Sequence, residues 1–291
     1  MTITASAPGS VMVTGEHAVV YGHPCVVAAV EQRATVTVAP LPGRTVRVHS
    51  ALGEVETTLD ALEPAGPLRF VLACVAAIGP EQGVEITTTS AIDPTLGLGS
   101  SAAVTVATFG ALAAFSGAEV DIHAEALVIV RAIQGRGSGA DLAASLHGGL
   151  SRYQLGAAVE ALPVPPAMSL KYVGYKTPTG EVLARVAEAW AGRDVDALYT
   201  RMGAAAEAAV VAARARDWAA MAVALDGYQG LMAELGVSNA DLDALVDEGR
   251  GQALAAKISG SGLGDCVLAF GGVPHGWERA KLAREGLVIH G

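Results

Sequence analysis

Segments with the apolar pattern of a β-strand and segments with the apolar spacing of a helix follow one another along the first half of the chain. Short β-branched or alternating segments predict strands at 11–13, 26–28, 35–38, 45–59 and 84–89. Apolar residues at helical spacing predict helices at 68–78, 104–115 and 124–133. This order predicts a mixed α/β unit with much antiparallel sheet.

A proline-rich run at 162–166 resists regular structure and precedes a change of pattern. We therefore place a domain boundary near residue 165, with one domain at 1–165 and a second at 166–291. The second part opens with a strand at 170–175 and ends with a strand, a glycine turn and a strand between 257 and 270. Alanine-rich helices are expected between them, at 180–191, 194–214, 217–235 and 239–255.

Composition narrows the class of protein. The 291 residues are 52% hydrophobic, which is ample for an independent core. A formal net charge of −10 argues against a nucleic-acid or anionic-membrane surface, because both need a basic footprint. Three distant cysteines suggest neither a disulfide framework nor a zinc site, and no leader or membrane-spanning pattern is recognised. We expect a cytoplasmic protein.

The segment from Gly97 to Ala102 runs straight into an apolar helix. Glycines at 97 and 99 permit positive φ and close approach, and a helix N-terminus offers free N–H groups to an anion. The segment is neither a Walker loop, since no lysine follows its last glycine, nor a dinucleotide-binding loop. It predicts a phosphate cradle; the alternative is a plain helix entrance capped by Ser100 or Ser101.

Two more glycine-rich segments follow. The one at 134–139 delivers Asp141 to the start of a short helix, where the carboxylate is either a helix cap or a catalytic group. The other, at 259–264, is either an ordinary hairpin turn or a close-approach wall of a site.

Together with 7–22, the segments at 97–102 and 257–266 resemble, in the same order, the GHMP small-molecule kinases, specifically the mevalonate and phosphomevalonate kinases. The resemblance implies a two-domain α+β fold, with an N-terminal half like domain 2 of ribosomal protein S5 and a ferredoxin-like C-terminal half. It places ATP and a small-molecule acceptor in the cleft between the halves. A homodimer is compatible with this class.

The resemblance also assigns roles to residues. It implies that the ATP phosphates are bound by Gly97, Leu98, Gly99, Ser100, Ser101 and Ala102, with the Ser101 hydroxyl also a ligand of Mg²⁺. It implies that Asp141 accepts or orients the proton of the acceptor hydroxyl, with Lys176 as a second catalytic group. Acceptor contacts are implied at Ser10, Glu16, His17, Arg136, Ser138, Gly139, Lys176, Thr179, Gly260, Ser261 and Gly262. For Glu16 and His17 the alternative is a turn salt bridge and a satisfied histidine, and for Lys176 it is solvated surface.

The chain departs from the resemblance at Ser10, where the family carries a lysine that pairs with the catalytic aspartate. Lys176, Arg136 or Lys257 is expected to replace it, unless metal and positioning suffice. The helix before Asp141 also lacks the glutamate that binds magnesium in mevalonate kinases, which leaves Ser101 and Asp141 as the expected ligands.

The resemblance divides between two acceptors. The ending Gly264-Asp265 and the segment 134–145 resemble phosphomevalonate kinases, whereas Glu16-His17 resembles mevalonate kinases. The sequence interpretation is phosphorylation of 5-phosphomevalonate by ATP, with mevalonate kinase as the alternative. A diphosphomevalonate decarboxylase or a non-catalytic ligand-binding member ranks third.

Overall fold

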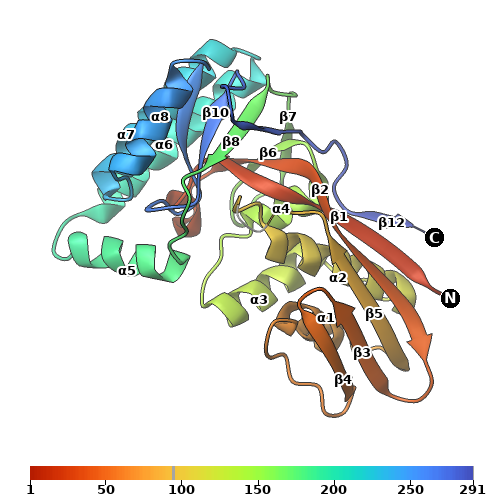
Figure 1. The fold of residues 1–291 in the computed structure, drawn as a ribbon. Coiled ribbons are helices and arrows are strands. Elements are labelled where there is room, and N and C mark those ends of the chain that lie inside the picture. The colour runs from red at the N-terminus through yellow and green to blue at the C-terminus, as the bar shows by residue number, and fades with distance from the viewer. Residues whose placement is uncertain (94–95, 291) are drawn as a thin grey trace.

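The computed structural model describes residues 1–93 and 96–290, which form two β-sheets and the helices that cover them (Figure 1). The larger sheet has the order β12-β1-β2-β5-β3-β4, with β6 paired to β2 and β7 to β6. Its strands are β1 (Ile3–Thr14), β2 (Cys25–Leu41), β3 (Thr45–Ser50), β4 (Gly53–Thr58), β5 (Gly83–Ser90), β6 (Leu150–Tyr153), β7 (Glu160–Leu162) and β12 (Val288–His290). The short strands predicted near the N-terminus are parts of β1 and β2, which pair antiparallel along almost their whole length.

The first core lies between this sheet and three helices, α1 (Arg69–Ile78), α2 (Ser100–Ser116) and α3 (Ile122–Gln134). Strand residues such as Val36 and Ile86 meet helix residues such as Phe109, and all three side chains are fully buried. Burial of this apolar surface is the main stabilising contribution to the unit. The predicted helices and strands of the first half are confirmed.

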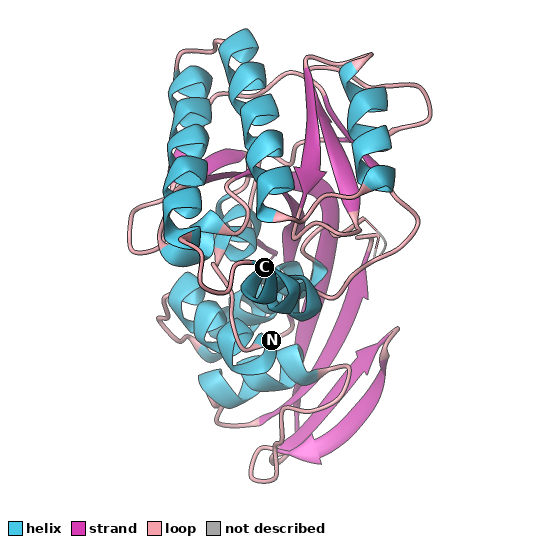
Figure 2. Cartoon of the chain, turned by 90° about the vertical axis from the view of Figure 1, so that its left-hand side faces the viewer, coloured by secondary structure: helices cyan, strands magenta, loops and turns pink. Residues whose placement is uncertain are grey.

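The smaller sheet and four helices make up most of the C-terminal half. The sheet has the order β11-β8-β10-β9. Its strands are β8 (Met168–Tyr172), β9 (Ala255–Ser259), β10 (Cys266–Phe270) and β11 (Glu278–Ala280), and the helices are α5 (Thr179–Ala189), α6 (Val195–Arg214), α7 (Trp218–Leu235) and α8 (Ala240–Arg250). Figure 2 shows the long helices standing beside this sheet and the shorter helices of the N-terminal half below them. The two-domain α+β architecture expected from the resemblance is confirmed.

One predicted helix is too long. Helix α8 ends at Arg250 rather than near residue 255. The backbone N–H of Leu254 already donates to the carbonyl of Phe270, at 2.9 Å, so the chain has joined the small sheet by that point. Pairing with a distant strand therefore overrides the local helical preference of the alanines.

The last strand returns to the first part of the chain. In β12, residues 288–290 pair with Thr4, Ala5 and Ser6 of β1. A boundary near residue 165, in the segment between β7 and β8, remains our proposal. Among the described residues, no helix combines the length and apolar character needed to span a membrane.

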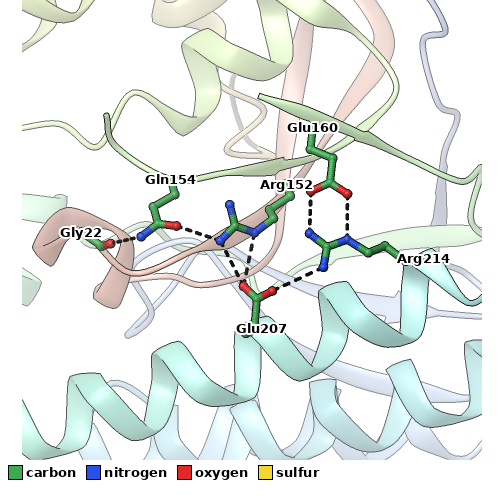
Figure 3. Close-up of polar contacts among 6 residues, drawn as sticks. All are labelled: Gly22, Arg152, Gln154, Glu160, Glu207 and Arg214. Atoms are coloured by element: carbon green, nitrogen blue, oxygen red, sulfur yellow. Dashed lines mark hydrogen bonds and ion pairs between the residues drawn. The ribbon is translucent and has the colours of Figure 1, made fainter. Parts of the chain in front are cut away.

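A chain of polar contacts fastens α6 to the N-terminal sheet (Figure 3). Arg152 of β6 contacts Glu207 of α6 at 3.1 Å, and Arg214 of α6 contacts Glu160 of β7 at 2.7 Å. The amide of Gln154 accepts from Arg152 and donates to the carbonyl of Gly22, which follows the 3-10 turn η1 (Ala18–Tyr21). The network links the helices of the C-terminal half to the turn that follows Glu16 and His17.

Candidate active site

The loop at 97–102 packs closely against β1, and the Ser10 N–H donates to the Leu98 carbonyl at 3.0 Å. Gly99 is the N-cap of α2 with φ 61°, and a Cβ there would lie 2.1 Å from the Ser10 Oγ, so only glycine fits. Ser100 and Ser101 lie inside the first turn and neither caps the helix, which removes the plain capped entrance as an explanation. The first turn also lacks acidic residues, so its N–H groups and dipole favour an anion.

Asp141 faces the same point of the loop. It lies in the first turn of α4 (Ala140–His147), whose N-cap is Gly139, so Asp141 does not cap the helix. Its Oδ1 accepts a 2.8 Å hydrogen bond from the Ser10 hydroxyl, and its Cβ lies 3.5 Å from the Cβ position of Gly99. The Asp141 side chain keeps solvent-accessible surface, yet the protein atoms packed around its carboxyl desolvate it. This desolvation raises the pKa of the carboxyl, and the Ser10 hydrogen bond lowers it.

Two residues that sequence analysis missed hold the Asp141 loop. The Tyr153 hydroxyl donates to the carbonyl of Ser138 at 2.6 Å, and burial raises the pKa of Tyr153 to about 12. The His123 Nε2 lies 3.1 Å from the carbonyl of Gly139 and donates to it. The backbone carbonyls of Ser138 and Gly139 are thus hydrogen-bonded to Tyr153 and His123. No local motif marks Tyr153 or His123, because each reaches the loop through tertiary packing.

Glu16 and Lys257 form a buried ion pair between the first and third motifs. The Lys257 Nζ donates to Glu16 Oε1 at 2.5 Å, with side-chain exposures of 1% and 3%. Burial raises the pKa of Glu16 and lowers the pKa of Lys257, and their mutual attraction opposes both shifts. The pair joins distant segments, so a local turn salt bridge is the wrong description. Glu16 Oε2 has no hydrogen-bond partner within the described structure.

His17 presents a second open acceptor. Its Nε2 lies 2.9 Å from the Ser261 carbonyl, which can only accept, so Nε2 carries the proton and Nδ1 a lone pair. Burial lowers the pKa of His17, which favours this neutral form. The buried Nδ1 and the Ser261 Oγ lack partners among the described residues. Buried polar atoms without partners are costly, so a ligand that satisfies them would gain binding energy.

Lys176 lies at another edge of the loop. Its Nζ is 3.3 Å from Asp265 Oδ1, and the Asp265 carboxylate is 3.7 Å from the Cβ position of Gly97. The backbone at Asp265 is left-handed, with φ 64°, and its N–H donates to the carbonyl of Tyr175 at 3.0 Å. Lys176 is thus an ion-paired residue beside the loop rather than free surface. Asp265 is a further site residue, and its place in the third motif was the available sequence signal.

Several predicted residues occupy the third motif and the margin of the site. The Cβ position of Gly260 lies 4.0 Å from Asp265 Oδ2, and Gly262 packs directly on Val237. Arg136 lines a cavity of about 260 Å³ with Tyr21 and α5, and Thr179 is exposed at the start of that helix. Among the described residues, no hydrogen bond or ion pair joins Arg136 or Thr179 to Asp141, so their acceptor roles stay predictions.

A magnesium site is not preformed. Within residues 1–93 and 96–290, no group of three or more His, Cys, Asp or Glu side chains gathers as it would around a metal. Ser101 is half-buried in the first turn of α2, and the Asp141 carboxylate faces the loop just before it. This sparse set suits an ion that brings most of its ligands with it, as Mg²⁺ does on a nucleotide.

Two family models match the chain. "GHMP kinases N terminal domain" covers residues 67–149, which include the phosphate loop and Asp141. "GHMP kinases C terminal" covers residues 209–283, which include Lys257 and the third glycine motif. Ser10, Glu16, His17 and Lys176 lie outside both matches.

Curated relatives extend the match to nearly the whole chain. The mevalonate kinase of Thermococcus sibiricus is 31% identical, over 99% of this chain and 98% of its own. The mevalonate kinase of Archaeoglobus fulgidus is 34% identical, over 98% and 99%. Among solved structures, a Listeria innocua protein superposes with a TM-score of 0.87 at 22% identity, covering 100% and 99% of the two chains. Streptococcus pneumoniae phosphomevalonate kinase with phosphomevalonate and AMPPNP gives 0.77 at 16%, over 91% of each. The chain therefore belongs to the GHMP kinases, and its activity is that of an ATP-dependent phosphotransferase.

Proposed function

We propose that this protein transfers the terminal phosphoryl group of ATP to the primary hydroxyl of mevalonate. The observation that carries the proposal is the placement of the Asp141 carboxylate against the loop of Gly99, at the N-terminus of α2. That loop would hold the ATP phosphates. Asp141 would accept the proton of the attacking hydroxyl.

The phosphoryl transfer needs one new bond, one broken bond and one proton acceptor. The acceptor oxygen forms a bond to the terminal phosphorus, the bond from that phosphorus to the bridging oxygen breaks, and ADP leaves. The hydroxyl proton passes to Asp141, whose raised pKa makes it a stronger base than a fully solvated aspartate. Mg²⁺ arriving with the nucleotide would supply charge neutralisation, with the Ser101 hydroxyl as its protein ligand.

Two buried acceptors that lack hydrogen-bond partners among the described residues suit a substrate with hydroxyl groups. Mevalonate carries two hydroxyl groups, and Glu16 Oε2 and His17 Nδ1 are buried atoms able to accept from a hydroxyl. Because burial lowers the pKa of His17, the ring stays neutral and keeps this accepting lone pair near neutral pH.

Two considerations favour mevalonate over 5-phosphomevalonate, the acceptor preferred from sequence. The curated relatives that match nearly the whole chain at 31% and 34% identity are mevalonate kinases. Asp265, which suggested the phosphorylated acceptor, contacts Lys176 and faces Gly97. Its carboxylate therefore has a role beside the phosphate loop whichever acceptor binds.

ADP release tests the proposal directly. Purified protein would be given Mg-ATP with mevalonate, with 5-phosphomevalonate, or with neither, and products would be identified by phosphorus NMR. We expect turnover with mevalonate alone, and a loss of about 10²–10⁴-fold in kcat for Asp141→Asn. Turnover only with 5-phosphomevalonate would establish the other acceptor, and inactivity with both would leave a ligand-binding member of the family.

A further inference from the structure

The negative charge that develops on a transferred phosphoryl group normally meets a cation, yet Asp141 and Ser10 supply none. Among the described residues, the hydrogen bonds and ion pairs of Asp141 lead only to Ser10. Lys257 is fully buried against Glu16, and Arg136 lines the cavity beside α5. Of the three cations that sequence analysis offered as replacements, this leaves Lys176.

Lys176 is held at the phosphate loop by its neighbour Asp265. Asp265 is itself fixed by the backbone, donating to Tyr175 at 3.0 Å and accepting from Val173 at 2.9 Å. Its carboxylate faces both Gly97 and Gly260. The aspartate is therefore a rigid anchor that sets where the lysine ammonium group can lie.

This anchor and Asp141 lie beside the same glycine loop. Gly97 faces Asp265, and Gly99 faces Asp141. Two residues of extended chain span at most about 7 Å, so the two carboxylates flank one short stretch of loop. The terminal phosphate of a nucleotide bound along that stretch would lie between them.

The ion pair also leaves the lysine free to take a second partner. The Lys176 side chain is 50% exposed, whereas that of Asp265 is 10% exposed. At 3.3 Å the contact lacks hydrogen-bond geometry, and Asp265 Oδ1 has no hydrogen-bond partner among the described residues. An ammonium group carries three donors on a flexible stem, so Lys176 can contact Asp265 and a phosphate oxygen together.

We propose that Lys176, positioned by Asp265, is the cation that contacts the terminal phosphate of the nucleotide. It supplies the positive charge that a lysine at the position of Ser10 would otherwise supply. Lys176 donates hydrogen bonds and charge to the phosphate, and no proton or covalent bond is transferred to it. Asp265 acts through Lys176 and is a positioning residue. The inference deepens the proposed phosphotransfer and rests on it for the chemical step.

The test compares Lys176→Met, Lys176→Arg and Asp265→Asn with a matched control, Lys171→Met. Lys171 lies on β8 and pairs with Glu248 at 2.8 Å, so the control also removes an ion-paired lysine. Asparagine tolerates left-handed backbone, so Asp265→Asn preserves the φ of 64°. Thermal unfolding confirms that each variant is folded, and kcat, KM and the calorimetric Kd for ATP and ADP are then measured.

We expect Lys176→Met to lower kcat by about 10²–10³-fold while the KM for the acceptor changes by less than about threefold. Its Kd for ATP should rise about tenfold more than its Kd for ADP, because only ATP carries the contacted phosphate. Lys176→Arg should retain most of the ATP preference. Asp265→Asn should lose an intermediate part of kcat, and Lys171→Met should match the wild type.

Two results would overturn the inference: a kcat for Lys176→Met within about threefold of wild type, or equal losses of ATP and ADP affinity. The Kd measurements for ATP and ADP use no acceptor, so they test the phosphate contact of Lys176 even if the wild type fails to phosphorylate mevalonate. That failure would contradict the proposed function alone.

Discussion

Asp141 combines a reactive carboxylate with an environment that disfavours its charge. Surrounding protein raises its pKa, so the folded state holds the proton more tightly than the unfolded chain does. The resulting stabilisation is full below the unfolded carboxyl pKa and is lost as pH rises through the raised pKa. At neutral pH the ionised side chain therefore costs stability, and Asp141→Asn removes that cost.

This predicts opposite effects of Asp141→Asn on activity and stability. Thermal unfolding between about pH 4 and pH 8 should show a higher Tm for the variant at the alkaline end, with the difference shrinking toward pH 4. An inactive variant with a Tm below wild type at every pH would mean that the carboxylate is a net structural support.

Ser10 tunes the same group, because its hydrogen bond lowers the pKa of Asp141. Removal of the hydroxyl in Ser10→Ala should raise that pKa further, so the acidic limb of the kcat/KM profile moves to higher pH. Ser145→Ala is the matched control, since Ser145 is a buried serine on α4 that donates to the Pro8 carbonyl instead. An acidic limb that stays in place in both variants would show that Asp141 is not the group that titrates in catalysis.

The three glycine motifs and Asp141 were visible from sequence because backbone-driven sites need glycine and small hydroxyl residues at fixed spacing. The residues that hold these motifs in place could not be predicted from the sequence. Tyr153, His123 and Tyr228 act through single hydroxyl or imidazole contacts made at long range, and Tyr228 donates to the Glu16 carbonyl from 212 positions away. No local pattern encodes such contacts.

Among the elements, β9 is joined to the first motif by the buried ion pair of Lys257 with Glu16 and by a hydrogen bond from Ser259 to the Met12 carbonyl. Removal of one partner leaves the other charge buried and unpaired, so Lys257→Met should lower the free energy of unfolding by about 3–5 kcal/mol. The double variant Glu16→Gln with Lys257→Met should recover part of the loss, since no unpaired charge remains.

Chemical denaturation measures both effects. Lys281→Met is the control, because Lys281 and Glu31 are exposed and 4.0 Å apart, and it should change stability by less than about 0.5 kcal/mol. If Lys257→Met proved as mild as this control, the buried pair would not be fixing β9 to the first motif.

Element types followed from periodicity, but several bounds did not. The segments predicted at 11–13, 26–28 and 35–38 are short, whereas β1 runs from Ile3 to Thr14 and β2 from Cys25 to Leu41. The added length comes from pairing between the strands and from helices on both faces. Val26 and Ala28 pack with α6, and Val27 and Ala29 pack with α4, which hides the alternation expected of a half-exposed strand. For this reason, the pattern at the N-terminus is continuously apolar.

At the scale of the whole molecule, the two halves are connected by a network of Arg152, Glu207, Arg214, Glu160 and Gln154 (Figure 3). Arg152 has a side-chain exposure of 17%, so it is the member that depends most on its partner. Glu207 contacts both Arg152 and Arg214. Neutralising it therefore weakens two ion pairs at once.

Glu207→Gln should lower the free energy of unfolding by about 1–2 kcal/mol, more than a typical exposed pair contributes. It should also raise the KM for the acceptor, because Arg152 holds Gln154, and Gln154 holds the carbonyl of Gly22 next to the Glu16–His17 turn. Glu234→Gln is the control: Glu234 pairs with Arg201 at 2.6 Å between α7 and α6, both within the C-terminal half. A KM increase shared by the two variants would indicate general loosening of the helices, whereas an increase confined to Glu207→Gln would show that the contact between the halves positions the acceptor site.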